Sequence, residues 1–278
     1  MLNIYKYSES VKQRLTQYGF VHLKCSSTDF LQDIKSSLQQ LQFKYSIPNI
    51  DYHVTLLSDS YTYKKEVEKI LLPLFDNICN EIMPGYTVLL TNMIIKNPYS
   101  GEVPLHQNWS FVDETTHRSY TIWIPLQDIM PNNGALEFIA GSHNLFCNEP
   151  RGHNTPYFFM NDREQLQSFK IPIFIQSGDA LLFDDAIIHY SAANKTESPR
   201  LAIQAILTPK DVPLLHYHYK RSIFGSKIYR IKVKKQFYDS MPIQIDKYTP
   251  YNYYKLRRIK PIEWQTIENL YKKYLLIK

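Results

Sequence analysis

Two histidines and one short polar side chain have the spacing that a mononuclear metal site requires. His106 and Asn108 lie two residues apart in the β-like run 104–109, so on an extended strand both point to the same face. His189, in an apolar run far downstream, would add a second imidazole from a distant strand. Two imidazoles and one carboxylate, with open positions beside them, are the donor set of non-haem iron sites, and Asn108 stands where that set has Asp or Glu. We therefore predict a metal site at His106, Asn108 and His189.

A hydroxyl and a guanidinium follow the second histidine. Ser191 lies two residues after His189 and shares its strand face, and Arg200 opens the next strand after a polar turn. An antiparallel return is expected to bring Arg200 alongside the His189 strand. Guanidinium groups bind carboxylates bidentately, and a nearby hydroxyl adds one more hydrogen bond. The pattern favours an organic-acid site beside the metal; the alternative is a surface Arg200 paired with Glu197.

Helices come first along the chain and strands follow. Apolar residues recur at helical spacing over 8–18, 26–42 and 62–82, and a last helix is expected over 262–276. Strand-like runs separated by turn signals occupy most of 86–209, which is typical of an all-β sandwich or barrel. The predicted strands are 20–24, 86–95, 118–126, 135–139, 171–175, 180–183, 186–191 and 200–208.

We predict a single domain over residues 1–278, mainly β with flanking helices. Residues 1–85 form its helical part and 86–209 its β core. Within the core, 144–170 is long enough to be a lid-like loop. Residues 210–278 form a basic, tyrosine-rich extension that closes with the last helix.

Composition narrows the class of protein. The net charge is +6, but the basic residues are spread along the chain, so a nucleic-acid partner is not expected. Cys25, Cys79 and Cys147 have no paired spacing, which argues against a disulfide framework and a zinc knuckle. No apolar run is long enough for a membrane span, and the N-terminus does not have the pattern of a signal peptide. We expect a cytoplasmic protein that is not bound to a membrane; the sequence does not indicate its oligomeric state.

The two histidine segments together resemble the phytanoyl-CoA dioxygenase family of Fe(II)/2-oxoglutarate-dependent oxygenases. His106-Gln107-Asn108 is followed, far downstream, by residues 189–196 and Arg200, in the order of the family's motifs. The similarity runs from about Tyr86 to Pro209. Supporting segments are 96–101, Trp123, 132–134 and 141–143, with a weaker one at 18–21.

The resemblance implies a double-stranded β-helix with iron at its mouth. His106 and His189 would hold the iron, and 2-oxoglutarate would chelate it, with its distal carboxylate on Arg200 and Ser191. Trp123 and Asn92 match positions that line the cosubstrate pocket, whereas Lys96 and His143 are interpreted as structural. The implied reaction uses Fe(II), 2-oxoglutarate and O2 to hydroxylate, or otherwise oxidise, an unactivated C–H bond of a small or carrier-tethered metabolite.

The departure from the family is Asn108, which stands where the pattern has Asp. Four interpretations are open: coordination through the amide oxygen, a ligand position left to water, substrate or halide, a degenerate site, or an introduced Asp→Asn change. They leave as alternatives a halogenase-like or other radical enzyme of the same fold and a non-catalytic binder of an organic acid. Glu114 has the strand parity of a substitute ligand but lies far from Asn108, so a substrate contact or surface position is preferred for it.

Overall fold

The computed structural model describes residues 8–47, 51–221, 226–240, 252–255 and 262–276, with the backbone alone for 252–255. The extension predicted over 210–278 is therefore described in parts. Within these ranges no helix is both long and apolar enough to cross a bilayer.

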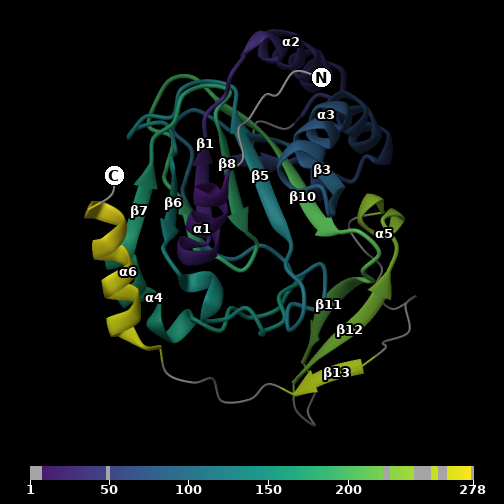
Figure 1. The fold of residues 1–278 in the computed structure, drawn as a ribbon. Helices are drawn as coiled ribbons and strands as arrows, with labels where there is room; N and C mark the ends of the chain where they lie inside the picture. The colour runs from purple at the N-terminus through teal and green to yellow at the C-terminus, as the bar shows by residue number, and fades with distance from the viewer. Residues whose placement is uncertain (1–7, 48–50, 222–225, 241–251, 256–261, 277–278) are drawn as a thin grey trace.

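Two antiparallel sheets form the body of the molecule (Figure 1). The larger sheet has the strand order β1-β8-β5-β10-β3-β2, and the smaller sheet has the order β4-β9-β6-β7. The strands of the larger sheet are β1 (Phe20–Leu23), β2 (Tyr52–Val54), β3 (Tyr86–Lys96), β5 (Tyr120–Pro125), β8 (Ala180–Asp184) and β10 (Arg200–Pro209). Those of the smaller sheet are β4 (Val103–His106), β6 (Leu136–Ile139), β7 (Lys170–Ile173) and β9 (His189–Ser191).

Aromatic side chains join the two sheets. Phe138 of β6 stacks on Phe20 of β1, with ring centroids 4.6 Å apart, and meets Phe183 of β8 at 5.1 Å. All three rings are almost fully buried, and Trp123 of β5 belongs to the same cluster. The inward-facing residues of the two sheets share one interior. This interior contains His106 and His189.

Helices cover the outer faces. The bounds of the longer ones are α1 (Glu9–Tyr18), α2 (Asp29–Lys44), α3 (Tyr61–Ile82) and α6 (Trp264–Leu276). Ser60 caps the start of α3, since its hydroxyl accepts a hydrogen bond from the Tyr63 amide, and the helix buries a stripe at helical spacing against the larger sheet. α6 lies beside the smaller sheet (Figure 1), where Trp264 stacks on Phe169. The larger sheet is thus covered on both faces, and β3 is buried without interruption from Val88 to Lys96.

The predicted order of helices and strands is confirmed, as is a mainly β core with flanking helices. The structure adds β2 and a third sheet of β11 (Leu214–Lys220), β12 (Lys227–Val233) and β13 (Asn252–Lys255), which the sequence did not predict. Lys and Tyr dominate this part of the chain, so the apolar alternation of a strand is weak there. A short helix, α5 (Gln236–Asp239), follows β12.

The segment 144–170 is partly folded. It contains α4 (Arg163–Leu166) flanked by two single 3₁₀ turns, Met160–Asp162 and Gln167–Phe169. Phe146, Phe159 and Leu166 are buried in a cluster with residues of the smaller sheet and of α6. This apolar anchoring holds the segment against the end of the β core.

Candidate active site

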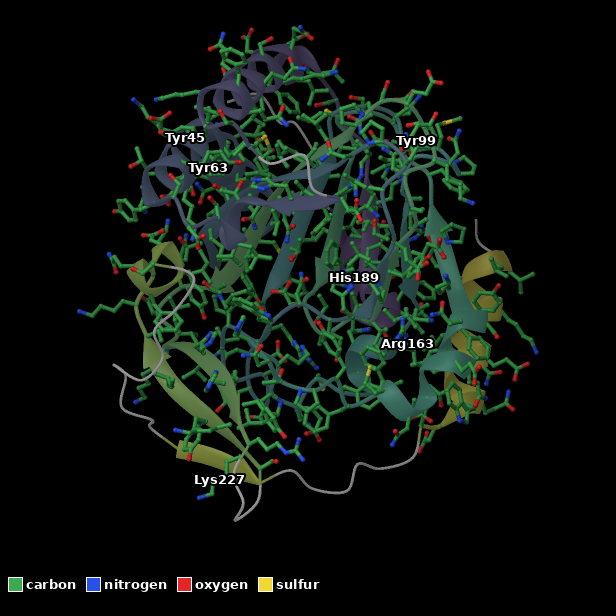
Figure 2. All side chains as sticks on the ribbon, turned by 180° about the vertical axis from the view of Figure 1, so that it is seen from behind. Tyr45, Tyr63, Tyr99, Arg163, His189 and Lys227 are labelled. Carbon is green, nitrogen blue, oxygen red and sulfur yellow. The ribbon has the colours of Figure 1, made fainter. Side chains whose placement is uncertain are left out.

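The two predicted histidines meet across neighbouring strands of the smaller sheet. His106 is the last residue of β4 and His189 the first of β9, and they are directly paired in the ladder. Their ring centroids are 4.1 Å apart with the planes at 48°. Figure 2 shows His189 in the middle of the body, far from Tyr99 and Lys227 at its periphery.

Backbone carbonyl groups fix the tautomer of both rings. The Nδ1 atom of His106 lies 2.8 Å from the Pro104 oxygen, and that of His189 lies 3.0 Å from the Ile187 oxygen. Because a carbonyl oxygen only accepts, each Nδ1 carries the proton and each Nε2 keeps a lone pair. Burial lowers the pKa of His106, and burial together with the neighbouring His106 lowers that of His189, so both rings are neutral. A neutral imidazole whose Nδ1 donates to a carbonyl group can bind a metal ion through Nε2.

Asn108 lines the same cavity as the two histidines, although not by the predicted route. β4 ends at His106, so strand parity does not place the Asn108 side chain. Instead its Nδ2 donates to Thr121 Oγ1 at 2.8 Å and to Asp185 Oδ1 at 2.9 Å. Burial raises the pKa of Asp185 to about 6, against the hydrogen bonds from Asn108 and Thr121 that lower it. Asp185 was not predicted from the sequence, because its hydrogen bond with Asn108 joins two segments that come together only in the folded chain.

Arg200 reaches the cavity from the opposite sheet. β10 pairs with β3 and β5, so the predicted placement of Arg200 beside the His189 strand is wrong. β9 and β10 are consecutive strands but belong to different sheets, so Arg200 reaches the His189 side of the cavity from across the interior. Arg200 is 2 % exposed, and its Nε and Nη1 atoms have no hydrogen-bond partner among the described residues. Its guanidinium carbon lies 5.3 Å from the centre of the Trp123 ring, and burial lowers its pKa to about 10.

Lys96 adds a second buried cation at this end. Its Nζ donates to Ser191 Oγ at 2.8 Å and to the carbonyl oxygens of Ser191 and Ala192 at 3.1 and 2.6 Å. Burial, followed by the charge of Arg200, lowers the Lys96 pKa to about 7. Lys96 thus ties β3 to the end of β9, in keeping with a structural role, and it orients the Ser191 hydroxyl. Two cations side by side form an environment that favours an anion.

The cavity has two chambers that share Tyr52, His106, Asn108 and Gln204. One chamber contains Arg200; we call it the Arg200 chamber. The other, the apolar chamber, has no Asp, Glu, Lys or Arg in its lining. Its further lining residues include Leu56, Leu90, Trp109, Phe111, Tyr157 and Ile206.

Trp123, Asn92 and Gln204 come from three paired strands. Gln204 of β10 is in register with Asn92 on one side and Trp123 on the other. Trp123, Ser191 and Arg200 line the Arg200 chamber, whereas Asn92 lines the apolar chamber and its Oδ1 accepts from the Leu56 amide at 3.0 Å. The sequence analysis missed Gln204 and Tyr52; strand parity with Arg200 was the signal for Gln204.

Glu114 corrects a further expectation, because it neither contacts the cavity nor lies at the surface. It is 6 % exposed, and its carboxylate pairs with Arg151 at 2.7 Å. Arg151 Nε also donates to the Asn108 backbone oxygen at 2.8 Å. The ion pair therefore anchors the 144–170 segment to the chain around Asn108. His143 has a structural contact, as its ring Nε2 donates to the Thr16 oxygen at 3.1 Å.

The donor set fits an iron ion, but it carries one negative charge fewer than the usual triad of two histidines and a carboxylate. Two Nε2 lone pairs and the Asn108 amide oxygen are nitrogen and oxygen donors suited to Fe(II). Within the described ranges no three His, Cys, Asp or Glu side chains converge on a common metal position. Asp185 is therefore not a third ligand beside the two histidines.

Comparison with known proteins also relates this chain to iron-dependent oxygenases. The sequence model of the phytanoyl-CoA dioxygenase (PhyH) family matches residues 17–202, which includes the N-terminal segment 18–21. A phytanoyl-CoA dioxygenase domain-containing protein 1 of Danio rerio is 31% identical over 137 residues, covering 46% of this chain and 47% of that protein. The peroxisomal phytanoyl-CoA dioxygenase of Homo sapiens is 26% identical over 139 residues, covering 46% and 41%. The matches thus span about half of each curated relative.

Solved structures share the fold. The non-haem alpha-ketoglutarate-dependent carbocyclase SnoK from nogalamycin biosynthesis superposes with a TM-score of 0.60 at 16% identity, covering 75% of this chain and 87% of that one. EctD from S. alaskensis, solved with 2-oxoglutarate and 5-hydroxyectoine, gives 0.56 at 16% identity, covering 74% and 78%. These likenesses confirm the double-stranded β-helix. The family match over residues 17–202 shows that the chain belongs to the phytanoyl-CoA dioxygenase family of Fe(II)/2-oxoglutarate-dependent dioxygenases.

Proposed function

We propose that the protein is a working Fe(II)/2-oxoglutarate-dependent oxygenase that hydroxylates an unactivated C–H bond of a small or carrier-bound metabolite. The observation that carries this proposal is Arg200. Its guanidinium is buried, and two of its nitrogens have no partner among the described residues. It lines the same cavity as two neutral histidines, whose Nδ1 atoms are hydrogen-bonded to carbonyl groups, so each Nε2 keeps its lone pair. Burying a cation without a partner is costly, so such a cavity is built for an anionic ligand.

Each residue has a role in this proposal. His106 and His189 would hold the iron through Nε2, with the Asn108 amide oxygen as a third ligand. Arg200 binds the distal carboxylate of 2-oxoglutarate, Trp123 covers the guanidinium, and Lys96 keeps the Ser191 hydroxyl in place. Iron bound there, with 2-oxoglutarate and O2, supplies the oxidising chemistry of the family.

The apolar chamber supports a substrate that is neutral where it meets the metal. Its lining is aliphatic, aromatic and amide, so a charged substrate group inside it would lose hydration without gaining a counter-ion. Leu57, which is 58% exposed, lies at the rim of this chamber. Tyr157 brings the 144–170 segment to the same chamber, which supports a lid role for that segment.

The arrangement of Asn108 argues against a halogenase-like site. An anion at the third ligand position requires an open space there, whereas the Asn108 side chain lines that position and is held by two hydrogen bonds. A non-catalytic binder of an organic acid would also retain Arg200, and turnover separates it from the oxygenase.

Formation of succinate from 2-oxoglutarate in the presence of Fe(II) and O2 tests the proposal. We expect the wild-type protein to form succinate slowly alone and faster with neutral, apolar candidate substrates, whose products carry one added oxygen. His189→Ala should abolish succinate formation. A reaction that is absent from the wild-type protein under all substrates, or that persists in His189→Ala, would contradict the proposed function.

A further inference from the structure

The orientation of the Asn108 amide is determined by its neighbours. Thr121 Oγ1 and Asn108 Nδ2 both lie within hydrogen-bond distance of Asp185 Oδ1, at 2.6 and 2.9 Å, and of one another at 2.8 Å. A carboxylate only accepts, so the Thr121 hydroxyl donates to Asp185 and accepts from Asn108. Both amide hydrogens of Asn108 are thereby used. The opposite orientation would place the amide oxygen against two acceptors, so Oδ1 is the atom left for the cavity shared with His106 and His189.

Asp185 is fully buried, and no cationic side chain of the described residues pairs with it. Its exposed fraction is 0 %, and its backbone amide is fixed by a hydrogen bond to the Ser119 oxygen at 3.1 Å. Arg118 is paired with the preceding residue, Asp184, at 3.9 Å, and no ion pair reaches Asp185 within the described part of the chain. A buried carboxylate without a cation is costly. A metal ion held by the two histidines would lie one side chain away from it.

We propose that Asp185 is a positioning residue for the metal site: through its hydrogen bond to Asn108 it turns the amide oxygen toward the metal and supplies the negative charge that a carboxylate ligand supplies directly. The inference rests on the proposed function. Acceptance of the Nδ2 hydrogens by a carboxylate polarises the amide and increases the electron density on Oδ1, as in other hydrogen-bonded chains. The carboxylate of the site is thus not a metal ligand itself but is hydrogen-bonded to one, Asn108.

This arrangement changes what Asn108→Asp should do. The single substitution would place two carboxylates face to face, with oxygens at the distance of the present 2.9 Å hydrogen bond. Like charges at that distance disfavour each other's ionisation. Asn108→Asp combined with Asp185→Asn restores the hydrogen bond with donor and acceptor exchanged and places the charge on the ligand itself. The exchanged pair, and not Asn108→Asp alone, should therefore give the stronger metal site.

Anaerobic titration with Co(II), followed by calorimetry and by the visible absorption of bound Co(II), tests the proposal on the full chain. Asp185→Asn should weaken Co(II) binding by about tenfold and alter the absorption, because the Asn108 amide loses its charged hydrogen-bond acceptor. The exchanged pair should bind at least as tightly as the wild type, and Asn108→Asp alone should bind more weakly than the exchanged pair and melt at a lower temperature without metal. Asp184→Asn is the matched control, since Asp184 is similarly buried at 2 % exposure and accepts from the Ala186 amide, whereas Asn108 donates to Asp185.

The outcomes are separable. Wild-type affinity and an unchanged spectrum in Asp185→Asn would overturn the inference, as would an equal loss in Asp184→Asn or equal binding by Asn108→Asp and the exchanged pair. If Asp185→Asn does not fold, the comparison of Asn108→Asp with the exchanged pair still decides. Failure of the wild-type protein to bind Co(II) would instead contradict the proposed function.

Discussion

At the scale of single residues, Arg200 shows how the fold prepares for an anion. The residue is 2 % exposed, its guanidinium lies over the Trp123 ring, and two of its nitrogens have no partner among the described residues. Burial alone lowers its pKa, and the adjacent Lys96 does not compensate its charge but adds to it. A bound carboxylate would relieve both penalties at once.

Arg200→Ala should therefore weaken 2-oxoglutarate binding without loss of stability. The lost charge-assisted hydrogen bonding corresponds to about 1.5–3 kcal/mol, or roughly 10- to 150-fold in Kd. Because the substitution removes an uncompensated buried cation, the melting temperature without ligand should stay the same or rise. Calorimetric titration with 2-oxoglutarate at saturating Co(II) measures the first effect. Unchanged affinity would place the carboxylate elsewhere.

Several site residues were predictable and others were not, for physical reasons. His106, Ser191 and Arg200 were found because metal and carboxylate chemistry restricts residue type, and strand parity fixes a face. Asp185 and Tyr52 were missed because they reach the site through tertiary contacts between distant segments.

At the scale of elements, a buried ion pair joins two segments that both reach the site. Glu114 follows Asn108 along the chain, and Arg151 belongs to the 144–170 segment, ahead of its helical part. The side chains are 3% and 1% exposed, and Arg151 also holds the Asn108 backbone oxygen. A break in this pair would loosen the third ligand position as well as the segment.

Glu114→Gln should destabilise the protein by about 3–5 kcal/mol, because the Arg151 charge stays buried without its partner. Urea denaturation measures the free energy of unfolding. Glu9→Gln, which removes an exposed pair with Lys12 at 3.9 Å, is the control and should have little effect. An equally small effect of Glu114→Gln would mean that water reaches the pair.

The single 3₁₀ turn Thr55–Leu57 places Leu57 at the rim of the apolar chamber. Leu57→Asp should raise KM for a neutral, apolar substrate up to roughly tenfold and leave kcat nearly unchanged, since the side chain contributes apolar contact alone. Met130→Asp is the matched control because Met130 is 53% exposed and lies outside both chambers. A lower KM in Leu57→Asp would indicate a cationic substrate.

Element prediction succeeded where periodicity was strong and failed where composition hid it. α3 was predicted within one residue of its observed start because its buried stripe repeats at helical spacing. The sheet β11-β12-β13 was missed because Lys and Tyr obscure its alternation. The pairing of β10 with β3 and β5 depends on the whole topology, which the local pattern around Arg200 does not contain.

At the scale of the whole molecule, buried neutral histidines link stability to pH. His143 donates from Nε2 to the Thr16 oxygen, and its buried Nδ1 has no partner in the described part of the chain. It packs so closely on Gly19 that a Cβ there would lie 2.4 Å from Nδ1. Burial, with a smaller contribution from Arg118, lowers the His143 pKa to about 4.

Between pH 6.5 and about 4 the unfolded chain binds a proton at His143 that the folded protein does not bind, so stability falls as the pH is lowered through this range. The full effect is roughly 3 kcal/mol. His143→Gln keeps a donor for Thr16 and cannot be protonated, so its unfolding free energy should depend less on pH there. Denaturation curves at pH 7, 5.5 and 4.5 measure this, and parallel pH profiles of the two proteins would refute it. Burial lowers the pKa of His216 to about 3, and its contribution to the pH dependence of stability is the same in both proteins.

The central claim is that one cavity holds iron and 2-oxoglutarate together, with His106 and His189 at one end and Arg200 at the other. Anaerobic calorimetric titration of the wild-type protein with 2-oxoglutarate, with Co(II) and with a chelator, tests it most directly. We predict tight binding with Co(II), much weaker binding with the chelator, and no Co(II) effect in His189→Ala. Binding of 2-oxoglutarate that is the same with Co(II) and with the chelator would contradict the claim and identify a metal-independent binder.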